Sequence, residues 1–170
     1  MDILIGTIFY LIAKRMHEDG FDFCFSGQGA DELFYGYDKY RRAITEGKDP
    51  ILLRNNDVFE LKEILKKREY KIYKHFGIDF MSPFLDEKLT KTALDLDISL
   101  NLKNQDDNLR KHVLREIAFQ LGAPEDIINR KKKALQYGSG ILEEIRRISK
   151  EKGIASSLNA YLEYIKKQNK

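Results

Sequence analysis

Two glycines and two acidic residues of one short segment have the types and spacing of an anion- and metal-binding site. Gly27 and Gly29 follow an alternating stretch rich in phenylalanine, and Asp31 and Glu32 come shortly after them. Glycine lets the backbone approach a ligand closely, and amides at the start of a helix point toward an anion. Carboxylates suit a hard cation such as Mg²⁺, which bridges to phosphate oxygens. Acidic residues in a first helical turn also simply complement the helix dipole, so the pattern alone leaves both interpretations open.

The patterns on either side of this segment predict the elements that position it. Residues 21–25 alternate and predict a short strand, residues 26–29 predict a turn, and a helix is expected from Ala30 toward Ile44. This is the one strand predicted, so its backbone partners lie either in a strand that the pattern does not reveal or on another chain.

The rest of the chain is predicted to be mostly helical. The helix over residues 2–18 is apolar nearly all round, so both of its faces are expected to be buried. Residues 82–86 are expected to be extended. Further helices are expected after Asn55–Asp57, after Asp86, from Asp106 or Asp107 to Leu121, and near 124–128, 141–151 and 155–168.

Composition and charge exclude several classes of protein. The chain has 170 residues, enough for one domain, and 42% of them are hydrophobic, which excludes a disordered chain. Thirty basic and 27 acidic residues give a net charge of +3, and no nucleic acid partner is expected. The longest apolar run, from Ile3 to Ala13, is too short to span a membrane. The single cysteine, Cys24, cannot form an internal disulfide, so a cytoplasmic location is expected.

Four stretches resemble, in the same order, the asparagine synthetase family. Residues 25–37 read Phe-Ser-Gly-Gln-Gly-Ala-Asp-Glu-Leu-Phe-Tyr-Gly-Tyr and resemble that family's Ser-Gly-Glu-Gly-Ala-Asp-Glu-Leu-Phe-Gly-Gly-Tyr signature. Residues 82–86 resemble its Arg-x-Pro-Phe-Leu-Asp segment, and residues 111–116 resemble its Lys-x-x-Leu-Arg-Glu helix. Residues 130–132, followed by 138–140, resemble its Arg-x-Lys and Gly-x-Gly segments. The resemblance covers about the C-terminal half of the family's synthetase domain.

This resemblance implies a fold and a reaction. The fold would be the C-terminal part of an α/β adenine-nucleotide-hydrolase-like (ATP pyrophosphatase) domain, seen here as predominantly α with one short strand. The family's domain adenylates the aspartate side chain with ATP and Mg²⁺, and ammonia then displaces AMP to give asparagine. The resemblance assigns Asp31 to the metal and Lys132 to catalysis, because a positioned cation stabilises charge on the reacting phosphate. It assigns to the pyrophosphate and acyl-adenylate the loop of Ser26, Gly27, Gln28 and Gly29.

Other residues of the matching stretches are expected to be structural. Residues 83–86 would form a corner with Phe84 and Leu85 in the core. Arg115, on a helix, would be an ion-pair partner. The basic run that contains Lys132 has a simpler interpretation as a solvated patch.

Two departures from the family's pattern bear on activity. Gln28 stands where the family has glutamate, and an amide cannot accept a proton as a base, so the ammonia step would be weakened while adenylation survives. The 170 residues contain neither the family's Ser-Gly-Gly-x-Asp-Ser pyrophosphate loop nor its N-terminal glutaminase cysteine. We therefore expect residues 1–170 to be a partial synthetase domain that does not turn over ATP alone. Its apolar surface would drive association with a complementary N-terminal half or with itself.

Two alternatives stay open. A non-catalytic interaction or regulatory relative of the ligase would explain Gln28, whereas Asp31, Arg130 and Lys132 argue against it. A related ligase that forms an amide or lactam from another carboxylate would use a similar site. No residue that recognises aspartate is identified, so the sequence does not separate these substrates.

Overall fold

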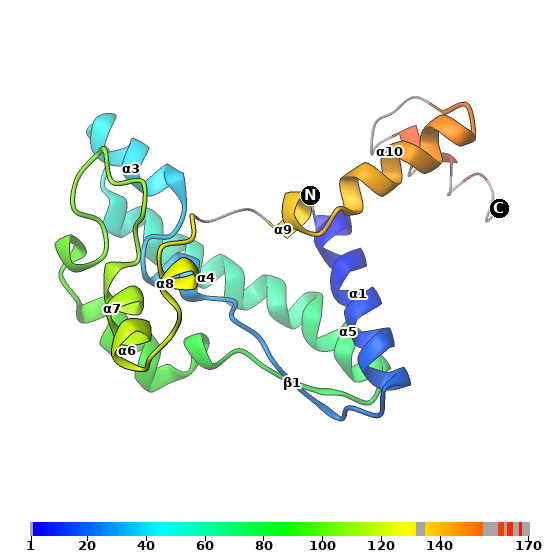
Figure 1. Ribbon diagram of the computed structural model, residues 1–170, viewed down its shortest axis with the longest axis horizontal. Coiled ribbons are helices and arrows are strands. Elements are labelled where there is room, and N and C mark those ends of the chain that lie inside the picture. Colours follow the sequence, from blue (N-terminus) through cyan, green and yellow to red (C-terminus); the bar gives the residue numbers. More distant parts are fainter. Residues whose placement is uncertain (1, 132–134, 155–159, 162, 165–166, 168–170) are drawn as a thin grey trace. The chain divides into compact units, whose positions relative to one another are not determined.

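The computed structural model describes residues 2–131, 135–154, 160–161, 163–164 and 167 (Figure 1). The chain divides into two compact units, one of residues 13–132 and one of residues 1–12 with 133–170. The elements run in the order α1 (Asp2–Glu18), β1 (Phe23–Phe25), α2 (Ala30–Leu33), α3 (Asp38–Thr45), α4 (Pro50–Lys67), α5 (Glu69–His75), β2 (Asp79–Met81), η1 (Pro83–Leu85), α6 (Glu87–Asp95), η2 (Ile98–Leu100), α7 (His112–Gln120), α8 (Glu125–Ile128), α9 (Leu135–Gly138) and α10 (Ile141–Glu151).

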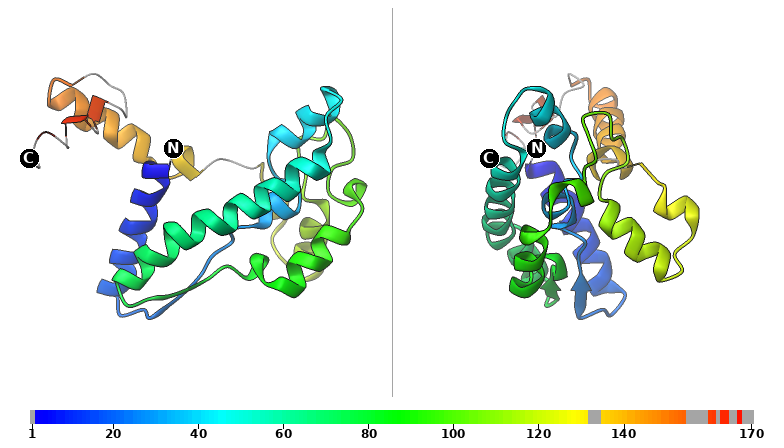
Figure 2. Two further views of the ribbon diagram at one scale, coloured as in Figure 1. Left: turned by 180° about the vertical axis from the view of Figure 1, so that it is seen from behind. Right: turned by 90° about the vertical axis from the view of Figure 1, so that its left-hand side faces the viewer.

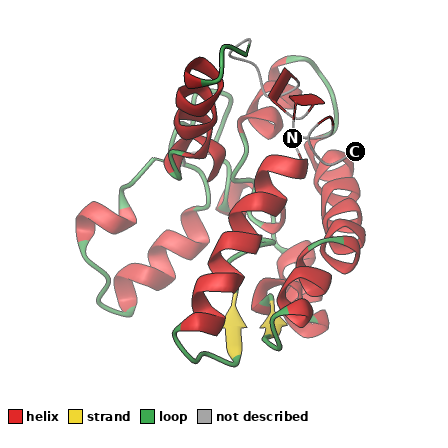
Figure 3. Cartoon of the chain, turned by 90° about the vertical axis from the view of Figure 1, so that its right-hand side faces the viewer, coloured by secondary structure: helices red, strands yellow, loops and turns green. Residues whose placement is uncertain are grey.

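The described part of the chain forms a sheet of two parallel strands, drawn in yellow in Figure 3. β1 pairs with β2 in a register that sets Phe23 opposite Asp79 and Phe25 opposite Met81. The predicted strand is present, but the number of one strand was wrong: of the two expected sources of its partner the structure shows the first, because residues 79–81 form a strand that the pattern did not reveal. Three residues are too few for an alternating pattern to be recognised.

The two faces of this sheet have different surroundings. Phe80 is buried and stacks on Tyr73 of α5, with ring centroids 4.6 Å apart. On the other face, the side chains of Phe23, Phe25 and Met81 are 38%, 68% and 49% exposed. Parallel sheets are normally covered on both faces. The described chain therefore covers one face of this sheet and leaves an apolar one open.

A core cluster joins α2, α4 and α6 beyond the glycine turn. Phe84 and Leu85 of η1 were expected in the core; they are half-buried and pack against this cluster at its edge. Val113 and Leu114 of α7 also pack against it, so the cluster holds the start of α7 near α2. The buried members of the cluster are Leu33, Phe34, Val58 and Ala93. Figure 2 shows the ribbon of the chain from two further directions.

The helix expected from Ala30 toward Ile44 is interrupted after Leu33. Tyr35 adopts a left-handed φ of 55°, which an α-helix of L-residues cannot accommodate. Its ring is buried and meets Tyr40 edge to face at 5.3 Å, so burial of the ring holds the unusual backbone. The chain turns over residues 34–37 before α3 begins at Asp38.

Helix α4 begins earlier than the sequence predicts. Asp49 caps it, since its Oδ1 accepts hydrogen bonds from the amides of Ile51 and Leu52 at 2.7 and 3.2 Å. Pro50 occupies the first helical position, where a missing N–H is tolerated. Asn55–Asp57, expected to cap this helix, lies inside it.

The predicted start of α7 and conformation of residues 82–86 also need correction. α7 begins at His112, because the carboxylate of Asp107 accepts hydrogen bonds from the amides of Leu109 and Arg110 and closes a turn instead of a helix. Pro83–Leu85 is a 3₁₀ turn and not an extended segment. Asp86 caps α6 as predicted, with its Oδ1 3.0 Å from the amide of Lys88.

Helix α1 has the predicted extent, but only one of its faces is buried. Leu4 and Ile8 are buried, whereas Ile3 and Leu11 are 54% and 50% exposed. Within the described ranges, none of the helices combines the length and apolar character that a membrane crossing requires. α10 matches the helix predicted near 141–151, and most of the helix predicted over 155–168 lies outside the described residues.

Candidate active site

The loop Ser26–Gly29 joins the end of β1 to the start of α2, as predicted. The amide of Ser26 donates to the carbonyl of Met81 at 2.8 Å and extends the sheet ladder by one residue. The Ser26 hydroxyl in turn accepts a hydrogen bond from the amide of Gln28 at 3.2 Å. Leu33 donates to the carbonyl of Gly29 at 2.9 Å, which starts the helical turn. Both ends of the loop are thereby fixed.

The two glycines of this loop differ in how much space a side chain would have. Gly29 has a φ of 96°, and a Cβ there would lie 2.7 Å from Cδ2 of Leu85 and 3.2 Å from Cβ of Phe84. A Cβ at Gly27 would meet nothing within 4 Å. Gly29 is therefore required by the packing of η1, while the space beside Gly27 is open to a ligand.

Asp31 is held between Gly36 and a lysine from a distant segment. Its Oδ1 lies 2.9 Å from Nζ of Lys111, and both side chains are about a quarter exposed, at 24% and 23%. The amide of Gly36 donates to the Asp31 carbonyl at 2.7 Å, and a Cβ at Gly36 would lie 2.1 Å from the Asp31 carboxylate. The absence of a side chain at Gly36 thus lets the carboxylate stay where Lys111 can reach it.

Glu32, the neighbouring acid, is used differently. It is buried, and its Oε1 accepts a hydrogen bond from the hydroxyl of Tyr37 at 2.8 Å. Burial raises the pKa of Glu32 above its ordinary value, and burial together with the nearby Glu32 carboxylate raises the pKa of Tyr37. Of the two acids, Asp31 is therefore the one suited to a charged ligand, and Glu32 supports the turn after α2.

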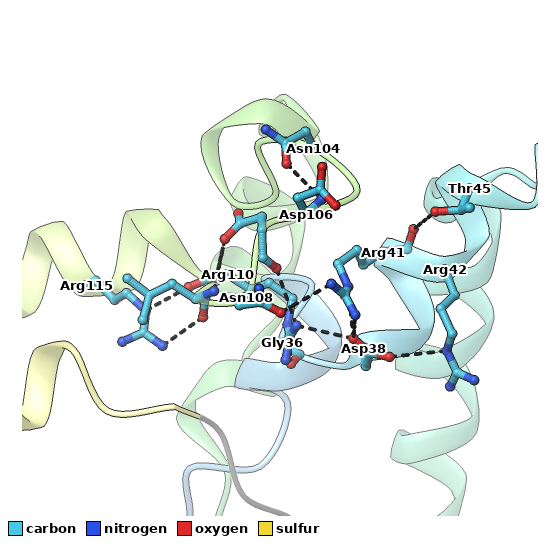
Figure 4. A network of polar contacts seen from close by, with 12 residues as sticks. Gly36, Asp38, Arg41, Arg42, Thr45, Asn104, Asp106, Asn108, Arg110 and Arg115 are labelled. Carbon is cyan, nitrogen blue, oxygen red and sulfur yellow. Dashed lines mark hydrogen bonds and ion pairs between the residues drawn. The ribbon is translucent and has the colours of Figure 1, made fainter.

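Two consecutive left-handed residues direct their side chains onto this turn. Arg110 and Lys111 have φ values of 55° and 54°. Arg110 is buried; its Nε donates to the carbonyl of Gly36 at 3.0 Å, and its Nη1 lies 3.6 Å from Oδ1 of Asp38 (Figure 4). Lys111 is a site residue that the sequence patterns did not indicate. The available signal was its position as the first residue of the Lys-x-x-Leu-Arg-Glu match.

The carboxylate of Asp107 organises the turn that precedes these two residues. It accepts hydrogen bonds from the amides of Lys103, Leu109 and Arg110, each at 3.0 Å, and its Oδ2 lies 2.7 Å from Nε2 of His112. Burial alone would raise the pKa of Asp107, but these hydrogen bonds outweigh burial and hold it at about 2. The turn is therefore built around an ionised carboxylate at neutral pH.

Arg115 ties α7 to the segment that leads toward Lys132. The prediction of an ion-pair role was wrong, because its guanidinium donates to main-chain carbonyls in two places. One is the start of α7, where it binds the carbonyls of Leu109 and Arg110 at 2.9 and 2.7 Å (Figure 4). The other is the segment after α8, where it binds the carbonyls of Ile128 and Arg130, the latter at 3.2 Å.

The structure brings together the Ser26–Gly29 loop, Asp31 and Lys111. Lys132, the residue assigned to catalysis, lies outside the described residues. Gly138–Gly140 belongs to the smaller unit, where Gly140 adopts a φ of 73° at the start of α10.

The donor set around Asp31 is compatible with a metal ion that is held mainly by its ligand. Within residues 2–131 and the other described ranges, no group of three or more His, Cys, Asp or Glu residues is arranged to hold a metal. Mg²⁺ bound to phosphates usually takes one or two carboxylates from the protein and keeps several waters. Asp31 supplies one partly exposed carboxylate, so the site fits a phosphate-borne Mg²⁺ and not a closed metal cage.

Comparison with known proteins finds relatives that all carry the name asparagine synthase or asparagine synthetase. A family model described as asparagine synthase matches residues 3–70 and 51–167. A putative glutamine-hydrolysing asparagine synthetase of Methanocaldococcus jannaschii is 30% identical, over 99% of this chain and 37% of that protein. Asparagine synthetase B of Escherichia coli is 28% identical and asparagine synthetase 1 of Arabidopsis thaliana 29% identical, each over 81% of this chain and 24% of the relative.

These matches cover between 81% and 99% of this chain but a minor part of each relative. The chain spans between about a quarter and somewhat more than a third of the length of these three curated relatives. The family model covers the Ser26–Gly29 loop, Asp31 and Lys111 alike. The chain belongs to the asparagine synthase family.

Proposed function

We propose that this chain is part of an ATP-dependent ligase that adenylates the side-chain carboxylate of aspartate and transfers ammonia to it. The products would be asparagine, AMP and pyrophosphate. The observation that carries the proposal is the pair of Asp31 and Lys111, opposite charges 2.9 Å apart and partly exposed beside a glycine loop. Family membership supports the same reaction class.

Each residue of the candidate site would have a role that follows from its chemistry. Ser26, Gly27, Gln28 and Gly29 would line the pyrophosphate and acyl-adenylate. Asp31 would hold a phosphate-bound Mg²⁺, which offsets the negative charge of the phosphates when it is bound. Lys111 Nζ, which lies 2.9 Å from Asp31, would bind a phosphate oxygen as a charge-assisted donor. Lys132 would stabilise the charge that develops on the α-phosphate.

A partner would complete the site. The matched relatives are much longer than the region that this chain covers, so we propose that a complementary N-terminal half, on the same polypeptide or on a second one, supplies the pyrophosphate loop. The open face of the sheet, with Phe25 68% exposed, supports association through this side. Association with a second copy is the alternative that sizing would detect.

A non-catalytic relative of the ligase is the second candidate, and Gln28 favours it because an amide is no base. The same geometry also fits a ligase that acts on another carboxylate. Turnover with a panel of carboxylates would separate that possibility from an asparagine-forming reaction.

Mg-pyrophosphate binding tests the proposal before any turnover is needed. Ligand that binds only the folded chain raises the melting temperature. Asp31→Asn should abolish this rise, whereas Glu32→Gln, a matched change in the same turn, should keep it because Tyr37 already engages that side chain. No rise in the unmodified chain, either alone or mixed with a complementary half, would favour the non-catalytic relative.

Pyrophosphate release with ATP, Mg²⁺, aspartate and ammonia then tests the reaction itself. The assay compares the chain alone with the chain mixed with a complementary half. Release in the mixture, lost in Lys132→Ala, supports the split ligase. Release by the chain alone would contradict the need for a partner.

A further inference from the structure

Glu69, at the start of α5, is a buried carboxylate that the proposed reaction does not use. Its side chain is fully buried, and its Oε1 accepts hydrogen bonds from Nε and Nη2 of Arg68 at 3.0 and 2.6 Å. Its Oε2 is also buried and has no hydrogen-bond partner among the described residues. Burying a carboxylate with an unsatisfied oxygen costs free energy, and a buried ion pair is weak evidence for stability. Glu69 therefore calls for an explanation beyond packing.

A third hydrogen bond to Glu69 comes from the candidate ligand loop. Nε2 of Gln28 donates to Oε1 of Glu69 at 3.2 Å. An ionised carboxylate can only accept, so the amide must present its N–H side to Glu69. Its oxygen is thereby directed to Ser26, whose hydroxyl donates to Oε1 of Gln28 at 3.3 Å. The carboxylate on α5 thus determines how the side chain at position 28 is oriented.

We propose that Glu69 is a positioning residue that supplies from α5 the carboxylate which the matched signature carries in the loop at position 28. The proposal rests on the proposed function, because it takes the loop to be the ligand site. Among the described contacts, Arg68 and Gln28 both bind Oε1 of Glu69, so the groups at this oxygen are one positive charge, one negative charge and one neutral amide. Moving the negative charge between positions 69 and 28 keeps that balance, whereas a second carboxylate upsets it.

A charge-exchange cycle tests this proposal. The chains are the unmodified protein, Gln28→Glu, Glu69→Gln and the double variant, with Glu63→Gln as control. Glu63 lies on the exposed face of α4, where Lys66 donates to it at 2.8 Å, so its neutralisation removes a charge without touching the loop. Folded and unfolded populations are measured by urea unfolding from pH 5 to pH 8.

Gln28→Glu should be destabilised and should lose stability as the pH rises. A carboxylate at the half-buried position 28 would lie at hydrogen-bond distance from the buried Glu69, and the two cannot both ionise freely, so one of them has a raised pKa in the folded state of this variant. A folded-state pKa raised by one unit lowers the folded-to-unfolded ratio about tenfold above that pKa. Glu69→Gln should also be destabilised, because it replaces the carboxylate that Arg68 binds at 2.6 Å by a neutral amide. In the double variant, the folded-to-unfolded ratio should recover to within about threefold of that of the unmodified chain, and the added pH dependence should disappear. If the two positions did not interact, the two losses of stability would instead add.

The proposal is overturned if Gln28→Glu is as stable as the unmodified chain across this pH range. It is also overturned if the double variant is no more stable than Gln28→Glu. Mg-pyrophosphate binding to the same chains tests the proposed function separately. An unmodified chain that fails to bind even when mixed with a complementary half would refute that function, while the unfolding cycle would still decide whether positions 28 and 69 share one carboxylate.

Discussion

Replacement of Gly29 by alanine probes the contact that fixes the candidate ligand loop. Gly29 has a φ of 96°, and a new Cβ would lie 2.7 Å from Cδ2 and 2.9 Å from Cγ of Leu85. Two costs follow. A non-glycine residue in the left-handed region costs roughly 1–2 kcal/mol, and overfilling a packed contact typically costs about 1–3 kcal/mol. Because Leu85 can shift part of the way, we expect Gly29→Ala to lower the free energy of unfolding by about 2–4 kcal/mol.

Gly27→Ala provides the matched control within the same loop. A Cβ at Gly27 meets nothing within 4 Å, and its backbone is not left-handed, so its effect on unfolding should stay within about 0.5 kcal/mol. Urea unfolding of the two variants measures the difference. A second comparison adds Leu85→Ala, which removes the clash but not the backbone cost. Gly29→Ala should then cost about 1–2 kcal/mol less in that background than in the unmodified chain.

Equal stabilities of Gly27→Ala and Gly29→Ala would refute this explanation of the loop. An equal cost of Gly29→Ala with and without the Leu85 side chain would refute one part of it. That second result would mean that the left-handed backbone, and not the contact with η1, makes glycine necessary at this position.

Two further predictions concern the turn before α7. The free energy of unfolding should fall as the pH drops from about 4 to about 2, because the folded state holds the pKa of Asp107 at about 2, below its ordinary 3.8, and the unfolded chain takes up the proton first. Asp107→Asn should flatten this slope in urea unfolding across that range, and an unchanged slope would contradict the assignment. Lys111→Gly should relieve the left-handed backbone and be more stable than Lys111→Ala by about 1 kcal/mol. Both should bind Mg-pyrophosphate at least about tenfold more weakly than the unmodified chain in calorimetric titration, because each removes the phosphate-binding amine; retained affinity would remove Lys111 from the site.

Local sequence patterns were sufficient where one or two residues determine the structure. The cap at Asp86 follows from a short polar side chain before an amphipathic run, and the turn at Ser26–Gly29 follows from its glycines after an aromatic strand. The extent of α1 follows from its long apolar run. Its burial does not, because the sequence shows that a face is apolar without showing what covers it.

The features that the patterns missed depend on contacts between distant segments. The positive φ of Tyr35 is held by a buried ring against Tyr40, so no property of residues 30–44 alone breaks the helix there. β2 exists because Phe80 fills the space beside Tyr73, not because three residues prefer a strand. Lys111 reaches Asp31 across 80 positions of sequence, and spacing along the chain carries no signal for such a pair.

Backbone strain is concentrated around the candidate site. Among the described residues, the non-glycine residues with positive φ are Tyr35, Arg110 and Lys111. Each lies in the turn after α2 or sends its side chain to the segment Asp31–Asp38. Such backbone costs roughly 1–2 kcal/mol per residue and persists only where surrounding contacts impose it.

Contacts of three neighbouring side chains impose this strain and determine where Lys111 lies. The Arg110 guanidinium is buried against the carbonyl of Gly36, the Asp107 carboxylate closes the preceding turn, and Arg115 binds the carbonyls of residues 109 and 110. A regular helix starting at Asp107 would relieve the strain but would lose these contacts. The fold thus retains an unfavourable backbone at Lys111 and thereby holds its amine beside Asp31. An ion pair with both partners about a quarter exposed adds little stability, so the surrounding contacts and not this pair offset the backbone cost, and the proposed ligand-binding role gives a reason for holding the Lys111 amine beside Asp31.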